Sequence, residues 1–103
     1  MEREKSPSWF YILRLTSGKL YCGSTRNHER RYAEHFSGAG CRTTKVDPPV
    51  EVAYEEQFPT YPAALRRERQ IKRWTRAKKE ALISGDLNAL HQLARRRRKE
   101  ILQ

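Results

Sequence analysis

Two tyrosines, an arginine and a histidine lie close together near the start of the chain. Tyr11 and Tyr21 flank a short turn, and Arg31 and His35 follow, four residues apart. A guanidinium can clamp a phosphate through two hydrogen bonds, and phenols and imidazoles can move protons. Glu68 adds a carboxylate, which can hold a divalent metal ion. Together these groups predict hydrolysis of a phosphodiester bond, which needs an activated water, positive charge on the phosphate and help for the leaving oxygen.

Each of these residues also has an ordinary structural explanation. Tyrosines in strands usually pack against neighbours, and charged residues on a polar helix face usually lie in solvent. Glu68 falls within an apolar stripe, where a carboxylate is seldom buried without a partner. It has cations close by in the sequence with which it could simply pair, namely Arg67, Arg69 and Lys72.

The elements that must position these groups begin with a hairpin. Residues 9–15 (WFYILRL) and 19–23 (KLYCG) are rich in aromatic and branched side chains and predict two strands. A two-residue loop between them would put the tyrosines on opposite faces. We expect a three-residue loop closed by glycine, which makes Tyr11, Tyr21 and Lys19 project from the same face.

A helix is predicted over residues 28–37, because Asn27 is a favourable N-cap and the glycine-rich sequence at 37–40 ends it. We expect a buried apolar face made of Tyr32, Ala33 and Phe36. A second, polar face then consists of His28, Arg31 and His35.

The rest of the chain predicts one more strand and further helices. Residues 41–49 read as loop, because two consecutive prolines bar regular structure, and residues 50–58 read as a strand. Helices are predicted over 60–74, over 76–83, and from a cap at Asp86 through Leu93, before the basic run at 95–99. This order predicts an α+β fold, a small three-stranded antiparallel sheet flanked by helices.

The charge balance favours a polyanionic partner. The chain has 103 residues, 22 of them Lys or Arg, and a formal net charge of +10. Domains this basic usually bind nucleic acid and less often an anionic membrane. No apolar run approaches the ~20 residues of a membrane span, and the polar N-terminus lacks the apolar region of a secretory signal. We therefore expect a cytoplasmic protein that does not enter a membrane.

The hairpin and the helix after it resemble the GIY-YIG endonuclease superfamily, in particular its small stand-alone bacterial members. The two motifs of that family read here as Trp9-Phe10-Tyr11 and Tyr21-Cys22-Gly23, and GSTRNHERRYAEHF continues the pattern. The sequence YPAALRRERQIKRW is similar to the family's glutamate-bearing helix, with Glu68 at the matching position. The resemblance implies a nuclease domain at 9–84, preceded by a disordered segment at 1–8 and followed by a helix and basic tail at 85–103.

The resemblance also implies a role for each matching residue. Glu68 would hold one divalent ion, Mg²⁺ or Mn²⁺, and Arg31 would hold the scissile phosphate. Tyr11 and Tyr21 would flank the attacking water, with Tyr21 preferred as general base and with cations nearby lowering its pKa. His35 would assist proton transfer or bind phosphate.

Substrate contacts are expected outside this catalytic set as well. Gly23 would let the substrate backbone approach the strand end. Some family members have a lysine directly after that glycine, where this chain has Ser24. Lys19 or Arg26 could replace that cation, and Lys72 lies in a basic helix expected to hold phosphates.

The predicted function is a metal-dependent endonuclease acting on DNA, preferably single-stranded or branched, as in family members that cut branched DNA or act in DNA repair. The sequence does not separate DNA from RNA as substrate. The alternative is a nucleic-acid-binding module that keeps the fold without the activity, or one that acts only with a protein partner.

Overall fold

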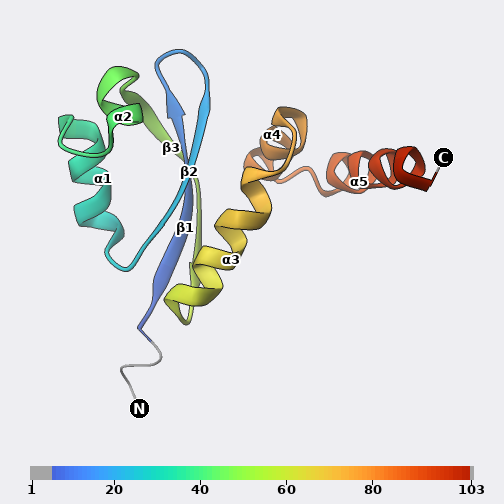
Figure 1. Ribbon diagram of the computed structural model, residues 1–103, viewed down its shortest axis with the longest axis horizontal. Coiled ribbons are helices and arrows are strands. Elements are labelled where there is room, and N and C mark those ends of the chain that lie inside the picture. Colours follow the sequence, from blue (N-terminus) through green and yellow to red (C-terminus); the bar gives the residue numbers. More distant parts are fainter. Residues whose placement is uncertain (1–5, 103) are drawn as a thin grey trace. The chain divides into compact units, whose positions relative to one another are not determined.

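The computed structural model describes residues 6–102, and of residues 95–102 it describes the backbone alone. These residues form two compact units that divide between Lys72 and Arg73. The first unit holds the sheet and three helices, and the second holds two helices (Figure 1). None of the helices within residues 6–102 is both long enough and apolar enough to cross a bilayer.

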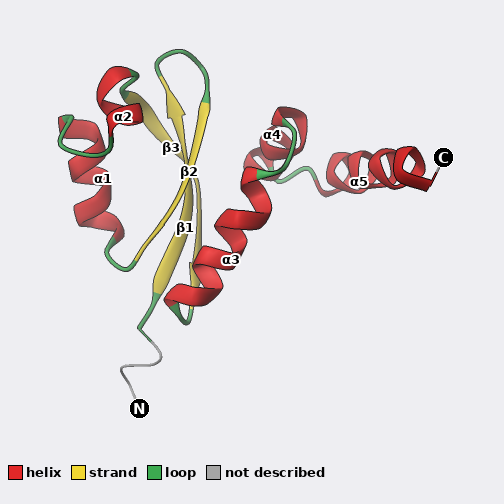
Figure 2. Ribbon diagram, viewed as in Figure 1, coloured by secondary structure: helices red, strands yellow, loops and turns green. Residues whose placement is uncertain are grey.

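The first unit is built on a three-stranded antiparallel sheet with the order β2-β1-β3 (Figure 2). Its strands are β1 (Ser8–Leu15), β2 (Leu20–Thr25) and β3 (Pro49–Phe58). The central strand is almost entirely buried, as expected for a strand that is paired on both sides and covered on both faces. The predicted α+β fold with three antiparallel strands is confirmed.

The hairpin has the three-residue loop that brings the tyrosines together. Tyr11 pairs with Gly23, and Leu13 pairs with Tyr21, so both phenols lie on one face of the sheet. The Leu15 amide donates to the Lys19 carbonyl at 2.9 Å, and Gly18 closes the turn with a φ of 91°. That φ lies in the left-handed region, which a glycine enters without strain.

Helix α1 (His28–Ser37) begins as predicted but buries a different face. The Asn27 side chain accepts a hydrogen bond from the Arg30 amide at 3.1 Å, which satisfies one free donor of the first turn. His35 is 1% exposed, whereas Phe36 is 47% exposed and Ala33 also lies at the surface. The prediction of an apolar face made of Ala33 and Phe36 is therefore wrong, because α1 turns His35 toward the sheet instead.

A short helix, α2 (Arg42–Val46), occupies part of the stretch predicted as loop. Its N-cap residue, Cys41, makes no side-chain capping hydrogen bond. The buried residue of α2 is Thr44, whose hydroxyl bonds to the His35 ring. Because the contact that holds α2 is tertiary, the local sequence gave no signal for this helix.

Helix α3 (Tyr61–Lys72) lies on the other side of the sheet from α1 (Figure 1). Its buried residues are Ala64 and Ile71. Side chains alternate across a strand, so the even-numbered residues Phe10 and Ile12 of β1 face α3 while Tyr11 faces α1. The helix ends at Lys72, two residues before the predicted end.

The second unit consists of α4 (Arg76–Ser84) and α5 (Leu87–Leu102). The Asp86 carboxylate accepts from the Ala89 amide at 3.0 Å and so caps the last helix, as expected. The helix continues through Leu102, so the predicted end near Leu93 is wrong. The side chains of the basic run at 95–99 lie outside the described part of the chain. Of the segment 1–8 predicted to be disordered, residues 1–5 also lie outside it, whereas Ser8 is buried and begins β1.

Candidate active site

Tyr11 and His35 form a buried pair beneath α1. The Tyr11 hydroxyl lies 2.9 Å from His35 Nε2, and both residues are 1% exposed. The edge of the Tyr11 ring also meets the ring of Tyr32, at a centroid distance of 5.2 Å. His35 was expected on a polar surface, but the structure places it in the core, where each ring nitrogen has a partner.

The other nitrogen of His35 is held by α2. Nδ1 lies 2.9 Å from Thr44 Oγ1, and the Thr44 hydroxyl also donates to the Cys41 carbonyl at 3.2 Å. Burial, together with the positive charge of Arg31, lowers the pKa of His35 below its usual value. The ring is therefore neutral near pH 7, with one N–H and one free lone pair.

Tyr21 stands beside this pair with a thiol as its partner. Its ring meets His35 edge-on at a centroid distance of 5.5 Å, and the Cys41 thiol donates to its hydroxyl at 3.2 Å. Burial and the bond to Cys41 raise the pKa of Tyr21 to about 12. Burial opposes ionisation of Cys41, but hydrogen bonds from Tyr21 and Thr44 bring the pKa of the thiol below its ordinary value.

Both motif tyrosines therefore stay protonated near neutral pH. Burial, followed by the proximity of Tyr21, raises the pKa of Tyr11 far above its usual value, and Arg31 offsets only part of that rise. The expectation that nearby cations lower the pKa of these phenols is wrong for the protein alone, because desolvation of a phenolate outweighs the attraction of one guanidinium.

Gly23 serves the packing of Tyr11. A Cβ at this position would lie 2.4 Å from the Tyr11 hydroxyl oxygen and 2.5 Å from the ring carbon that carries it. The phenol thus rests directly on the backbone of its cross-strand partner. The space that was expected to admit substrate backbone here is filled by Tyr11.

Glu68 lies at the edge formed by α3 and β2. The Ser24 hydroxyl donates to its Oε1 at 2.6 Å, and the Lys72 ammonium lies 2.8 Å from its Oε2. The Glu68 side chain is 13% exposed. Its negative charge contributes, as a minor cause, to the raised pKa of both Tyr11 and Tyr21.

The surroundings of Glu68 fit a single hard divalent ion. Within the part of the chain that the structure describes, no three His, Cys, Asp or Glu side chains group as a metal site. One carboxylate suffices for Mg²⁺, which keeps several of its waters and takes further oxygen ligands from a phosphate. The ammonium of Lys72 already occupies a cation position at Oε2, and its side chain is 55% exposed, so it is free to give way.

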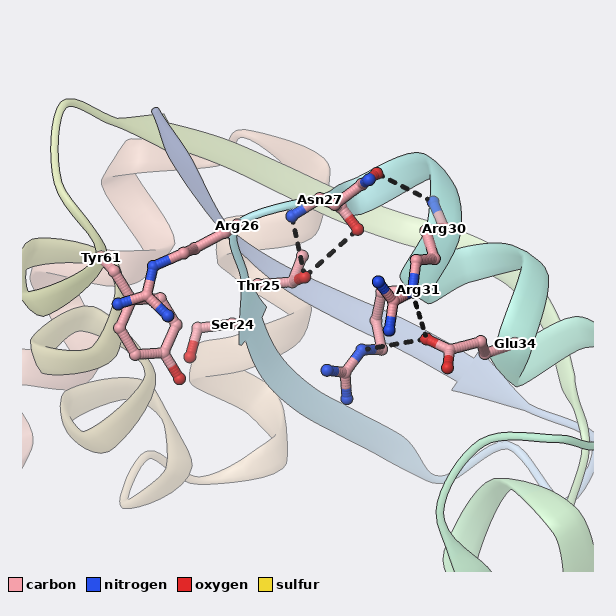
Figure 3. Close-up of a pocket in the computed structure, with 8 residues that line it drawn as sticks. All are labelled: Ser24, Thr25, Arg26, Asn27, Arg30, Arg31, Glu34 and Tyr61. Carbon is pink, nitrogen blue, oxygen red and sulfur yellow. Dashed lines mark hydrogen bonds and ion pairs between the residues drawn. The ribbon is translucent and has the colours of Figure 1, made fainter. Parts of the chain in front are cut away.

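Arg31 lines a cleft at the start of α1 (Figure 3). Its positive charge offsets part of the rise in the pKa of Tyr11 and Tyr21 and adds to the fall in the pKa of His35. Its side chain is 47% exposed, and its Nε lies 3.6 Å from a carboxylate oxygen of Glu34. The guanidinium is therefore near the buried pair and also open to solvent.

The cleft has a volume of about 210 Å³ and is rich in guanidinium groups. Arg26, Arg30 and Arg31 line it, with Glu34 as the carboxylate between the last two. The Arg26 guanidinium lies 4.3 Å above the centre of the Tyr61 ring, as Figure 3 shows. Ser24, the residue that bonds Glu68, also lines the cleft.

The predicted substrate contacts lie in different places. Arg26 lines this cleft and Lys72 pairs with Glu68, whereas Lys19 lies outside the cleft. Lys19 follows the hairpin turn and lines a separate cavity of about 380 Å³ with Arg42, Val46 and Asp47. Asp47 accepts hydrogen bonds there from the backbone and hydroxyl of Ser17. Lys19 thus shares a face with Tyr21 without joining the cleft.

Sequence reasoning missed three residues that touch the catalytic set, namely Ser24, Cys41 and Thr44. Ser24 was read as the loss of a cation, yet its hydroxyl is the donor that holds Glu68. Cys41 and Thr44 lie in a segment read as loop. The available signal was Gly40 ahead of them, where a Cβ would lie 2.7 Å from His35 Nδ1.

Comparison with known proteins supports this reading of the chain. The model of a family described as the GIY-YIG catalytic domain matches residues 7–81. A UPF0213 protein of Natronomonas pharaonis is 42% identical over 78 residues, covering 76% of this chain and 92% of that protein. A UPF0213 protein of Bacillus pumilus is 40% identical over 80 residues, covering 78% and 82%.

One solved structure shares the fold as well as the sequence pattern. The solution NMR structure of a UPF0213 protein from Bacillus halodurans superposes with a TM-score of 0.51 and 34% identity. It covers 78% of this chain and 85% of that one.

Proposed function

The chain belongs to the GIY-YIG family, whose catalytic domain is of nuclease type, and from this premise we propose that it is a metal-dependent endonuclease that hydrolyses phosphodiester bonds in DNA. The observation that carries the proposal is the buried contact of 2.9 Å between Tyr11 and His35. The charges of Arg31 and Glu68 also contribute to the pKa shifts of both phenols, which supports their proposed roles as phosphate clamp and metal ligand beside this proton carrier.

In this proposal Arg31 binds the scissile phosphate. Its partly exposed guanidinium can exchange Glu34, 3.6 Å away, for a phosphate that offers two oxygens in a matching plane. As negative charge builds on the equatorial oxygens, the same guanidinium stabilises the transition state.

Tyr11 and His35 move the proton of the attacking water. The Tyr11 oxygen accepts a proton from water as its own proton passes to His35 Nε2, so no free phenolate has to form. The raised pKa of Tyr11 makes an isolated phenolate costly, and its bond to a neutral imidazole avoids that cost. Tyr21, whose partner is a thiol, lies beside the water as a hydrogen-bond donor.

Glu68 would hold the divalent ion, Mg²⁺ or Mn²⁺, with Ser24 keeping the carboxylate in place through Oε1. Such an ion would neutralise charge on the phosphate and on the leaving oxygen. Lys72 would then be available to a neighbouring phosphate.

The cleft next to Arg31 supports single-stranded or branched DNA as the substrate. It continues from Ser24, beside Glu68, to Arg26 and the Tyr61 ring. Guanidinium groups bind the phosphates on either side of the cut, and the Arg26–Tyr61 stack offers a flat surface to an unpaired base. A base within a duplex could not reach that surface.

A cleavage assay tests the proposal. End-labelled single-stranded, duplex, flapped and four-way-junction DNA and one RNA are incubated with Mg²⁺ or Mn²⁺ and with a chelator control. Wild type is compared with Glu68→Gln and with Glu29→Gln, a matched change at an exposed glutamate of α1. We expect metal-dependent cutting by wild type and Glu29→Gln, strongest on single-stranded or flapped DNA and lost in Glu68→Gln.

Two other outcomes contradict the proposal in different ways. Cutting by Glu68→Gln at the wild-type rate would remove the metal role of Glu68. Salt-sensitive DNA binding by a wild type that does not cut would favour a binding module or a missing protein partner.

A further inference from the structure

We propose that Thr44 is a positioning residue, which holds His35 in the tautomer whose proton is on Nδ1 and so leaves Nε2 free to accept the Tyr11 proton. The catalytic importance of this tautomer rests on the proposed function, in which Tyr11 and His35 move the proton of the attacking water. The position of the ring proton stands independently of any activity.

The hydrogen-bond inventory of Thr44 supplies the first step. A threonine hydroxyl has a single hydrogen and two lone pairs. The Cys41 carbonyl, 3.2 Å away, can only accept, and the Thr44 hydroxyl lies in position to donate to it. With the hydroxyl hydrogen on that carbonyl, the contact of 2.9 Å between Thr44 Oγ1 and His35 Nδ1 takes its hydrogen from the ring, which puts the N–H on Nδ1.

The contact at His35 Nε2 also indicates that the ring proton is on Nδ1. His35 Nε2 is the one hydrogen-bond partner of the Tyr11 hydroxyl within residues 6–102. If Nε2 carried the proton, it would donate to the Tyr11 oxygen, and the phenolic hydrogen would have no acceptor among the described residues. A buried donor left without a partner is costly. The Nδ1–H tautomer satisfies the whole chain from Tyr11 through His35 and Thr44 to the Cys41 carbonyl.

In the protein without substrate, the bonds of this chain are shielded from bulk solvent. Tyr11 and His35 are each 1% exposed, and Thr44 is fully buried. A Cβ on Gly40 would lie 2.7 Å from His35 Nδ1 and 3.1 Å from Thr44 Oγ1. The backbone of Gly40 thus closes over the bond between the two side chains, and the space is too small for a larger residue.

The position of the proton on the His35 ring decides whether Tyr11 can transfer its own proton to His35. With Nε2 unprotonated, His35 accepts the Tyr11 proton and becomes an imidazolium that still donates to Thr44. With the proton on Nε2, the imidazole could only donate to Tyr11, and the transfer would be blocked. The segment from Gly40 to Thr44, which carries no group that reaches the phosphate in our proposal, thereby sets the direction of the proton transfer.

The experiment compares Thr44→Val, which keeps the shape and removes the hydroxyl, with Thr44→Ser, which keeps the hydroxyl. Thr43→Val is the matched control, because Thr43 is the exposed neighbour on the same helix. Long-range ¹H–¹⁵N NMR spectra of the histidine rings, recorded without metal or DNA, report the tautomer of His35 in each protein. Single-turnover cleavage of a flapped DNA gives the rate of the chemical step.

We expect the Nδ1–H pattern in wild type, Thr44→Ser and Thr43→Val, and its loss in Thr44→Val. The cleavage rate of Thr44→Val should fall by roughly 10²-fold, the lower end of what a positioned proton acceptor contributes, with DNA affinity unchanged. Thr44→Ser should restore most of the rate.

An Nε2–H pattern in wild type overturns the proposal, whether or not the protein cuts DNA. A Thr44→Val protein with wild-type ring signals and wild-type cleavage overturns it too. Absence of cleavage in all four proteins, with the expected NMR pattern, would count against the proposed nuclease function and leave the tautomer assignment standing.

Discussion

At the scale of single residues, the site depends on how closely Tyr11 is packed. The phenol rests on Gly23, bonds to His35 and meets Tyr32 edge-on. Each contact restricts the ring in a different direction, so its hydroxyl has one position. Precise placement of a proton carrier matters because proton transfer requires hydrogen-bond distance to both partners.

Gly23→Ala should therefore disable the site. The new methyl group would overlap the Tyr11 hydroxyl, since a Cβ there lies 2.4 Å from that oxygen. We expect a loss of about 1–3 kcal/mol in unfolding free energy, as for other overpacked cores, and cleavage below detection. Urea unfolding and the cleavage assay measure the two effects. Gly38→Asn, at a glycine whose φ is 83° with open space around it, is the control and should retain cleavage.

His35 should make the protein less stable in acid. Its pKa is lowered by burial in the folded state, so the unfolded chain binds a proton at a higher pH, near 6.5. The unfolding free energy then falls as the pH drops below about 6.5 and stops falling below the folded-state pKa. Urea titrations from about pH 7.5 to about pH 5 measure this slope. The slope should decrease in His35→Gln and persist in His91→Asn, and equal slopes in all three proteins would contradict the assignment.

At the scale of elements, helix α3 presents Glu68 and Lys72 as an i, i+4 pair on the edge beside β2. The pair gives the carboxylate a resident cation in the absence of metal. Any divalent ion at Glu68 has to compete with this ammonium. If Glu68 holds a metal as proposed, the helix would influence its affinity through a residue that is not itself a ligand.

Lys72→Met should tighten metal binding. Removing an i, i+4 ion pair on a helix is worth about 0.3–0.5 kcal/mol, which corresponds to about a twofold lower Mn²⁺ concentration for half-maximal cleavage. Titration of the cleavage rate with Mn²⁺ measures it. Lys79→Met, a matched change on α4, should leave the midpoint unchanged, and a higher midpoint in Lys72→Met would contradict the competition.

Elements also show what the sequence could and could not predict. The hairpin register followed from a three-residue loop ending in glycine, and the start of α1 followed from Asn27, because both signals are local. The prediction of the buried face of α1 was wrong because it placed the apolar Phe36 inside and the polar His35 outside. Hydrogen bonds to Tyr11 and Thr44 hold His35 in the interior instead. Helix α2 had no local signal, since its buried side chain is held by a residue nine positions earlier.

At the scale of the whole molecule, the net charge of +10 suits a polyanionic substrate. Within the first unit, part of this charge is concentrated in the cleft at the start of α1, where three arginines face one glutamate. Their contacts with phosphates displace counterions, so affinity should depend steeply on salt.

Arg30→Ala tests the contribution of the cleft. The affinity for a fluorescent single-stranded oligonucleotide, measured over a range of salt concentrations in the Glu68→Gln background, should fall, and the salt slope should decrease by about 1. Arg42→Ala removes the same charge beside the cavity that Lys19 lines. It should change the affinity and the salt slope much less. Equal effects of the two changes would show that binding is diffuse and that the cleft has no special part in it.

The pairing of Tyr11 with Gly23 has a consequence for how activity arises during folding. The Tyr11 ring of the first motif fits only over Gly23 of the second. The hairpin can therefore close with this packing in one register alone. A slip of one residue would turn Tyr21 to the far face and set a side chain beneath Tyr11. A misaligned chain cannot present both phenols on one face, so the proposed active site would form only after the hairpin has closed in the correct register.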